Sequence, residues 1–206
     1  MTKQERTRII RRELKKLFPH VRCFLNHSTP WELLVGVILS AQCTDKKVNE
    51  VTAKLFKKYP RFQDYLTANS KEFEKDIFQT GFYRAKTKSI LETAKLVNEK
   101  FGGKVPRTMN EILTLRGVAR KTANVVLGNA YNVVEGIAVD THVMRLSRKF
   151  GLSSGKNPVQ IERDLMKIIP QEEWLDFTHR VIEYGRAYCP AKSHDHENEP
   201  LVKALN

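Results

Sequence analysis

The chain has 206 residues, 41% of them hydrophobic, which is enough for one large domain or two small lobes that share a core. It carries 36 Lys and Arg against 23 Asp and Glu, and the formal net charge of +13 predicts a polyanionic partner, most simply a nucleic acid. A membrane surface is disfavoured as that partner because the basic residues are spread along the chain, without a detached amphipathic arm or a lipidation motif.

The N-terminal residues have no apolar stretch and no cleavage-like site, so they do not resemble a secretory signal. The longest apolar run, residues 31–39, contains Glu32 and is too short to span a bilayer. Cys23, Cys43 and Cys189 are widely separated and odd in number, a pattern typical of free buried thiols in a reducing compartment. We therefore expect a cytoplasmic protein without disulfide bonds.

Apolar residues recur at helical spacing along nearly the whole chain, for example in residues 10–17, 48–55 and 90–101, and no alternating strand pattern occurs. Residues 31–40 are apolar on almost all sides, which predicts a central helix surrounded by the others. Proline and glycine mark the expected helix boundaries at Pro30, Gly102, Gly103, Pro158 and Pro170. The sequence predicts an all-α fold of about ten short helices.

Residues 112–127, ILTLRGVARKTANVVL, predict two helices joined by a tight turn. The first helix is expected to end at Leu115, Gly117 lies in the turn, and the second helix begins at Arg120. The first N–H groups of the second helix lack intrahelical acceptors, so they can hold a DNA phosphate without reading the base. A purely structural role stays open for this hairpin, because short turns between packed helices are common.

Lys121 lies in the first turn of that second helix, beside Arg120, where the helix dipole and the like charge both disfavour a protonated amine. It is a candidate nucleophile, and a phosphate contact through its charge is the alternative. Asp140 precedes an amphipathic segment and is expected to cap that helix. If the two segments converge, its carboxylate can stabilise positive charge on a sugar or help activate the amine.

Four segments closely resemble the endonuclease III family of bifunctional thymine-glycol DNA glycosylases, namely LSAQCTDKKV at 39–48, GFYRAK at 81–86, LRGVARKTANVVL at 115–127 and IAVDTHVMRLSRK at 137–149. The likeness runs from about Leu14 to Cys189. It implies a six-helix barrel with the hairpin at residues 22–134, and a second helical lobe built from residues 1–21 and 135–206. The resemblance also implies an active site in the cleft between these lobes.

The resemblance implies that Lys121 attacks the sugar C1′ of a flipped nucleotide, with Asp140 as the catalytic aspartate, and that a Schiff base then permits β-elimination. Gln42 matches the residue inserted opposite the flipped base, and Phe82 matches the intercalating wedge. Taken alone, Gln42 could cap a helix and Phe82 could belong to the core.

Ala119 replaces the hairpin's second glycine, and a left-handed conformation there would cost about 1 kcal/mol or more. Further DNA contacts are expected at Arg84, Gly117, Val118, Ala119, Arg120 and His142.

The family usually ends in four cysteines, spaced C-x6-C-x2-C-x5-C, that bind a four-iron, four-sulfur cluster. Here only Cys189 remains, and the later positions are His196, Glu199 and Leu205. Since the cluster requires thiolates, we expect it to be absent. Zinc binding by Cys189, His194 and His196 is disfavoured because they lie in or beside a polar tail that is expected to be solvated, so we expect no metal and no cofactor. Ordinary packing is then expected to hold this lobe, through Trp174, Phe177, Val181, Ile182 and Tyr184.

The resemblance therefore predicts a monomeric base-excision-repair enzyme that acts on double-stranded DNA. We expect it to remove oxidised pyrimidines such as thymine glycol and then to cut the strand as an AP lyase. Two alternatives stay open: a noncatalytic helix-hairpin-helix DNA-binding protein that lost cluster and activity together, and a lyase acting only on abasic sites. A monofunctional adenine glycosylase is disfavoured because that related group lacks the lysine nucleophile.

Overall fold

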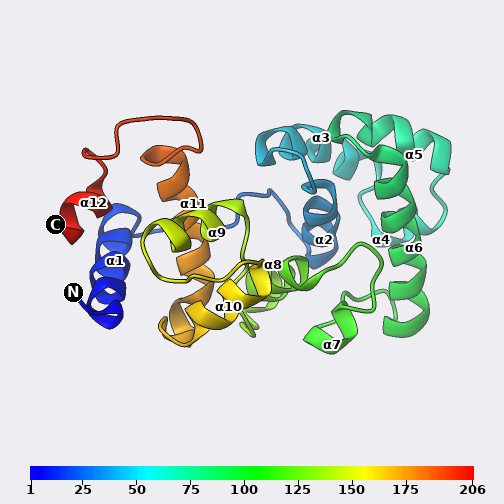
Figure 1. Ribbon diagram of the computed structural model, residues 1–206. Helices are drawn as coiled ribbons and strands as arrows, with labels where there is room; N and C mark the ends of the chain where they lie inside the picture. Colours follow the sequence, from blue (N-terminus) through cyan, green and yellow to red (C-terminus); the bar gives the residue numbers. More distant parts are fainter. The chain divides into compact units, whose positions relative to one another are not determined.

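The computed structural model describes all 206 residues, and its regular structure is entirely helical (Figure 1). The predicted all-α class is confirmed, with twelve α-helices and two 3-10 helices. No helix is both long enough and apolar enough to cross a membrane. The elements are α1 (Lys3–Leu17), α2 (Pro30–Leu39), α3 (Asp45–Lys58), α4 (Phe62–Leu66), α5 (Ser70–Ile77), η1 (Phe78–Thr80), α6 (Tyr83–Phe101), α7 (Met109–Ile112), α8 (Arg120–Tyr131), α9 (Thr141–Lys149), α10 (Pro158–Met166), η2 (Gln171–Glu173), α11 (Trp174–Ala187) and α12 (Pro200–Leu205).

The chain forms two compact units, each with its own hydrophobic core. The central unit is Cys23–Val133 and contains α2 to α8. The terminal unit combines Met1–Arg22 with Val134–Asn206, and it contains α1 and α9 to α12. Residues from both ends of the chain therefore share one core.

Helix α2 lies at the centre of its unit, in contact with α3, α6 and α8. Thr29 caps its N-terminus by accepting a hydrogen bond from the Glu32 N–H at 3.1 Å, and Pro30 occupies the first turn. Every residue from Leu33 to Leu39 is buried. Because each buried leucine or valine side chain contributes about 1.5–3 kcal/mol, this helix dominates the core of the central unit. The prediction of a central helix is confirmed.

The terminal unit brings α1 against α11 and α12, and α9 against α10 and α11 (Figure 1). Helix α1 begins with a capping box between Thr2 and Glu5, and it buries Ile10 and Leu14. All five side chains expected to pack the C-terminal part are buried, and four of them join the main core cluster: Trp174, Phe177, Val181 and Tyr184. The packing prediction is confirmed for this unit.

The polar stretch at residues 192–200 was expected to be a solvated tail before a short apolar end. Most of this stretch is exposed, but Glu199 is buried, at 2% exposure. The apolar end forms helix α12 at residues 200–205, whose Leu201 is 1% exposed in the core. The tail prediction was wrong at Glu199, because residue polarity alone does not show that a carboxylate will find buried partners.

Candidate functional site

The hairpin consists of α7, a turn, and α8. Helix α7 ends at Ile112 rather than at the expected Leu115. The chain tightens after it, since the Thr114 N–H donates to the Glu111 carbonyl at 3.0 Å and the Leu115 N–H donates to the Ile112 carbonyl at 3.2 Å. These i→i+3 bonds replace the last α-helical turn. The predicted start of the second helix, at Arg120, is confirmed.

Ala119 precedes α8 in an extended conformation, with φ −98° and ψ 171°. The strain that a left-handed alanine would carry therefore does not arise, and the missing glycine leaves the turn intact. Ala119 provides no side-chain cap to α8. The positive end of the helix is consequently not covered by a capping side chain, as a phosphate-binding helix end requires. Lys121, in the first turn, is exposed.

The turn of the hairpin is fixed on α6. Gly117 has φ +77°, and a Cβ added there would lie 3.1 Å from the Ser89 Cβ. Only glycine combines this backbone conformation with this close approach. One turn further along α6, the Thr93 hydroxyl donates to the Arg116 carbonyl at 3.0 Å. Helix α6 thus determines where the start of α8 points.

Gln42 and Phe82 share an uncommon backbone conformation. Both lie in the left-handed region, with φ +54° at Gln42 and φ +46° at Phe82. Apart from glycines, only Asn132 also has a positive φ, and asparagine tolerates it at the C-cap of α8. Strained residues of this kind cluster at functional sites. Both side chains are exposed, so neither belongs to the core.

Phe82 stands in an exposed aromatic group at the start of α6. Its ring is 64% exposed, and Phe78, on η1, is 60% exposed. The rings of Phe78 and Tyr83 lie 4.9 Å apart, and the Arg84 guanidinium lies 5.5 Å from the Tyr83 ring centroid. Exposed aromatic rings with a stacked arginine are suited to contact with nucleobases and phosphates.

Lys86 connects the Gln42 and Phe82 loops, and the sequence analysis did not assign it a role. Its side chain is buried, and Nζ donates to the Leu39 carbonyl at 2.8 Å and to the Thr80 carbonyl at 2.7 Å. Burial lowers the pKa of Lys86, and Cys43 acts in the opposite direction. Lys86 lies four residues before Ile90, on the apolar face of α6. This spacing in the sequence could have predicted that its side chain is buried.

Replacing Lys86 with methionine is expected to lower the unfolding free energy by about 3 kcal/mol, because two buried carbonyls lose a charged donor. For a chain of this length, that loss corresponds to a fall in melting temperature of roughly 6–12 °C. Calorimetry and fluorescence anisotropy with duplex DNA measure both stability and affinity. Lys88→Met is the matched control, since Lys88 is on the same helix and 61% exposed. An unchanged melting temperature in Lys86→Met would contradict the view that this amine stabilises the two loops through its hydrogen bonds.

Asp140 caps α9 in the terminal unit. Its Oδ1 accepts a hydrogen bond from the Val143 N–H at 2.8 Å, and the side chain is partly buried. The capping role predicted from the sequence is confirmed. The cap uses one carboxylate oxygen, so capping and a chemical role are compatible.

His142 follows Asp140 in the first turn of α9. Its ring packs on α11 at Gly185, where an added Cβ would lie 2.4 Å from Nδ1. No residue with a side chain fits at that position without moving the imidazole. The residues with a predicted role thus fall into two sets: Gln42, Phe82, Arg84 and the hairpin are brought together around α6, whereas Asp140 and His142 belong to the terminal unit.

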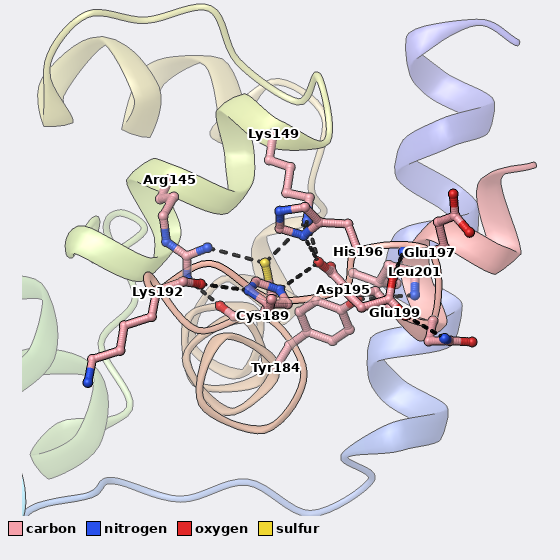
Figure 2. A network of polar contacts seen from close by, with 12 residues as sticks. Arg145, Lys149, Tyr184, Cys189, Lys192, Asp195, His196, Glu197, Glu199 and Leu201 are labelled. Atoms are coloured by element: carbon pink, nitrogen blue, oxygen red, sulfur yellow. Dashed lines mark hydrogen bonds and ion pairs between the residues drawn. The ribbon is translucent and has the colours of Figure 1, made fainter.

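The C-terminal segment contains a possible metal site (Figure 2). Cys189, His194, His196 and Glu199 each offer one ligand atom, and these four atoms lie within 4.8 Å of one another. The prediction of no metal and no cofactor was therefore wrong, because the polar segment brings four donor side chains together. The donors do not match a four-iron, four-sulfur cluster, which requires thiolates, since only Cys189 is a thiol.

Glu199 is the most heavily paired of these donors. Burial alone would raise the pKa of its carboxyl, but hydrogen bonds from Lys149, His196, His194 and Cys189 lower that pKa to about 2. Its Oε1 also forms an ion pair with Lys149, and its Oε2 accepts from the Tyr184 hydroxyl at 3.1 Å. The carboxylate is consequently charged at neutral pH.

Residues 35–171 match the HhH-GPD superfamily of base excision DNA repair proteins. The chain is 49% identical over 191 residues to an endonuclease III from Synechocystis sp., a match covering 93% of this chain and 87% of the relative. It is 48% identical over 178 residues to an endonuclease III from Bacillus subtilis, covering 86% and 81%. An Escherichia coli endonuclease III is 38% identical over 192 residues, covering 93% and 90%.

Solved structures agree with these relatives. A trapped endonuclease III–DNA covalent intermediate matches with a TM-score of 0.93 and 44% identity, covering 99% of this chain and 95% of that one. A non-covalent endonuclease III–DNA complex matches with the same values. A thermostable thymine-DNA glycosylase, 22% identical with a TM-score of 0.80, shares the fold.

Proposed function

Because the chain belongs to the endonuclease III family of HhH-GPD base excision DNA repair proteins, we propose that it removes oxidised pyrimidines, such as thymine glycol, from double-stranded DNA. As a member it is a DNA glycosylase and AP lyase. The observation that carries the proposal is Lys121, an exposed amine in the first turn of α8.

The proposed reaction begins when the lone pair of the Lys121 Nζ attacks the sugar C1′. The bond between C1′ and the base breaks, the base leaves with the electron pair, and one proton from Nζ passes to the base. Opening of the sugar ring transfers the second Nζ proton to O4′ and gives a Schiff base between C1′ and Nζ. Loss of a C2′ proton then expels the 3′ phosphate by β-elimination, and water releases the lysine.

In this mechanism Asp140 supplies negative charge. Its carboxylate can stabilise the positive charge that develops on the sugar, or accept a proton as the amine attacks. The hydrogen bond that Asp140 Oδ1 accepts from the Val143 N–H holds the carboxylate in place.

The exposed residues of the central unit are suited to binding and distorting the duplex. The uncapped start of α8 is suited to a phosphate, which a hairpin binds without reading sequence. Extruding a nucleotide costs a few kcal/mol and leaves a gap in the stack. We propose that Gln42 fills this gap and that the Phe82 ring holds the kinked step open.

Borohydride trapping tests the proposal on two duplexes, one with thymine glycol and one with a preformed abasic site. A covalent adduct on both is the expected result, since a Schiff base must form after base removal as well as at an abasic site. Trapping on the abasic duplex alone would reduce the protein to a lyase. Absence of an adduct on either duplex would support a noncatalytic DNA-binding protein.

Affinity for DNA should depend strongly on salt, because the chain has 36 Lys and Arg against 23 Asp and Glu. If about six phosphates are neutralised, the dissociation constant should rise about a thousandfold between roughly 50 and 200 mM salt. Fluorescence anisotropy with an undamaged duplex measures this slope. A flat response would contradict phosphate binding by the basic surface.

A further inference from the structure

We propose that Cys189, His194, His196 and Glu199 bind one zinc ion, which fastens the C-terminal segment of the terminal unit. The segment runs from the end of α11 to the start of α12. Cys189 and Glu199 are buried, at 0% and 2% exposure, and the two histidines lie between them in sequence. Figure 2 shows the sulfur of Cys189, the His196 ring and the Glu199 carboxylate turned toward one another.

The donor chemistry favours zinc over other metals. A thiolate, imidazole nitrogens and a carboxylate are the ligands that zinc uses, and four protein ligands make a closed structural site. Around tetrahedral zinc, donor atoms lie about 3.3–3.6 Å apart, as follows from Zn–N and Zn–S lengths of about 2.0–2.3 Å. The four donors here lie within 4.8 Å of one another, so shifts of about an ångström bring them to that geometry.

Both ring nitrogens of His194 have polar neighbours. Nδ1 lies 2.8 Å from the Lys192 carbonyl, and Nε2 lies 3.0 Å from the Glu199 Oε1. An imidazole with one nitrogen at a backbone carbonyl and the other beside a further donor atom is the arrangement typical of zinc ligands.

The Lys149 ammonium group occupies the space between the proposed metal ligands. Its Nζ lies 3.4 Å from the Cys189 Sγ and 2.7 Å from the His196 Nδ1, and it also contacts the Glu199 Oε1. One ammonium group therefore lies among three of the four donors (Figure 2). A divalent ion at this position would neutralise the thiolate and the carboxylate, and the long lysine side chain would turn away.

Other side chains already orient the donors as a supporting shell does. Arg145 donates through Nη1 to the Cys189 Sγ at 3.2 Å and through Nη2 to the Cys189 carbonyl at 2.6 Å. The Tyr184 hydroxyl donates to the Glu199 Oε2 at 3.1 Å and accepts from the Leu201 N–H at 3.2 Å. Because four protein ligands would leave no open coordination position, the proposed role of zinc is structural.

Metal analysis of the untagged protein tests the site. After exposure to Zn²⁺ and removal of the excess, we expect about one zinc per chain in the wild type. Cys189→Ser and His194→Ala should retain less than about a tenth of it, and His20→Ala, at an exposed histidine of the same unit, should retain all of it. Co²⁺ should give the visible bands of a tetrahedral ion and a sulfur-to-cobalt charge-transfer band, which Cys189→Ser lacks.

Lys149→Met tests whether zinc or the Lys149 ammonium is the cation of this site, because it removes the ammonium and leaves the four donors. If zinc binds, this variant should bind it at least as tightly as the wild type, and zinc should raise its melting temperature by about 5 °C or more. Failure of the wild type and of Lys149→Met to bind Zn²⁺ or Co²⁺ would overturn the proposal. So would zinc retained in full by both ligand variants, or iron and sulfide found in its place.

Discussion

Lys121→Gln is expected to abolish both strand cutting and borohydride trapping, on thymine glycol and on abasic sites. Glutamine keeps much of the side-chain length but has no amine, so no Schiff base can form. The rate should fall by at least about a thousandfold, equivalent to roughly 4 kcal/mol of barrier. Gel assays under single-turnover conditions measure this loss.

Binding should survive the same substitution. Lys121 is exposed, and the start of α8 and the turn at Gly117 do not depend on its side chain. The dissociation constant for an abasic duplex should therefore rise by less than about tenfold, the loss of a single phosphate contact. Lys88→Gln, at an exposed lysine of α6, is the matched control and should cut normally. Undiminished cutting by Lys121→Gln would contradict the assignment of the nucleophile.

Asp140→Asn should lower the rate of base removal by about 10²–10⁴-fold while leaving the fold intact. Asparagine is as good an N-cap as aspartate, so the hydrogen bond to the Val143 N–H is retained and only the negative charge is lost. The size of the effect is that of a positioned acid–base or charge-stabilising group. Single-turnover kinetics and a melting curve on the same preparation separate chemistry from stability.

Asp140→Ala is the companion variant. It removes the charge and the cap together, so it should lose activity and also about 1 kcal/mol of stability. If Asp140→Asn has full activity while Asp140→Ala is destabilised, Asp140 is a cap alone.

Local sequence patterns predicted the elements that carry the site better than the contacts that hold them. The run at residues 31–40, apolar on almost all sides, predicted α2, and the motif at residues 115–127 predicted where α8 begins. The end of α7 was misplaced because its last turn changes to i→i+3 bonds, which leave no mark in the apolar period. The roles of Lys121, Gln42 and Phe82 stay predictions until the variants are measured.

Contacts between distant residues could not be predicted from local patterns. Lys86 meets the Leu39 carbonyl 47 residues away, and nothing in a periodic pattern names that acceptor. The C-terminal segment was misjudged for a similar reason. Lys149 and Tyr184, which pair with Glu199, come from α9 and α11, so the burial of this carboxylate becomes visible only in the folded unit.

The left-handed conformations of Gln42 and Phe82 also bear on the kinetics of damage search. Each costs about 1–2 kcal/mol, and the folded chain holds both. If these side chains enter the duplex as proposed, the free-energy cost of ordering them falls on folding rather than on binding. Encounter with DNA would then be limited by diffusion and charge rather than by loop motion. A glycine at either position is expected to relieve the backbone strain and to slow engagement of each lesion, because the inserted side chain is lost.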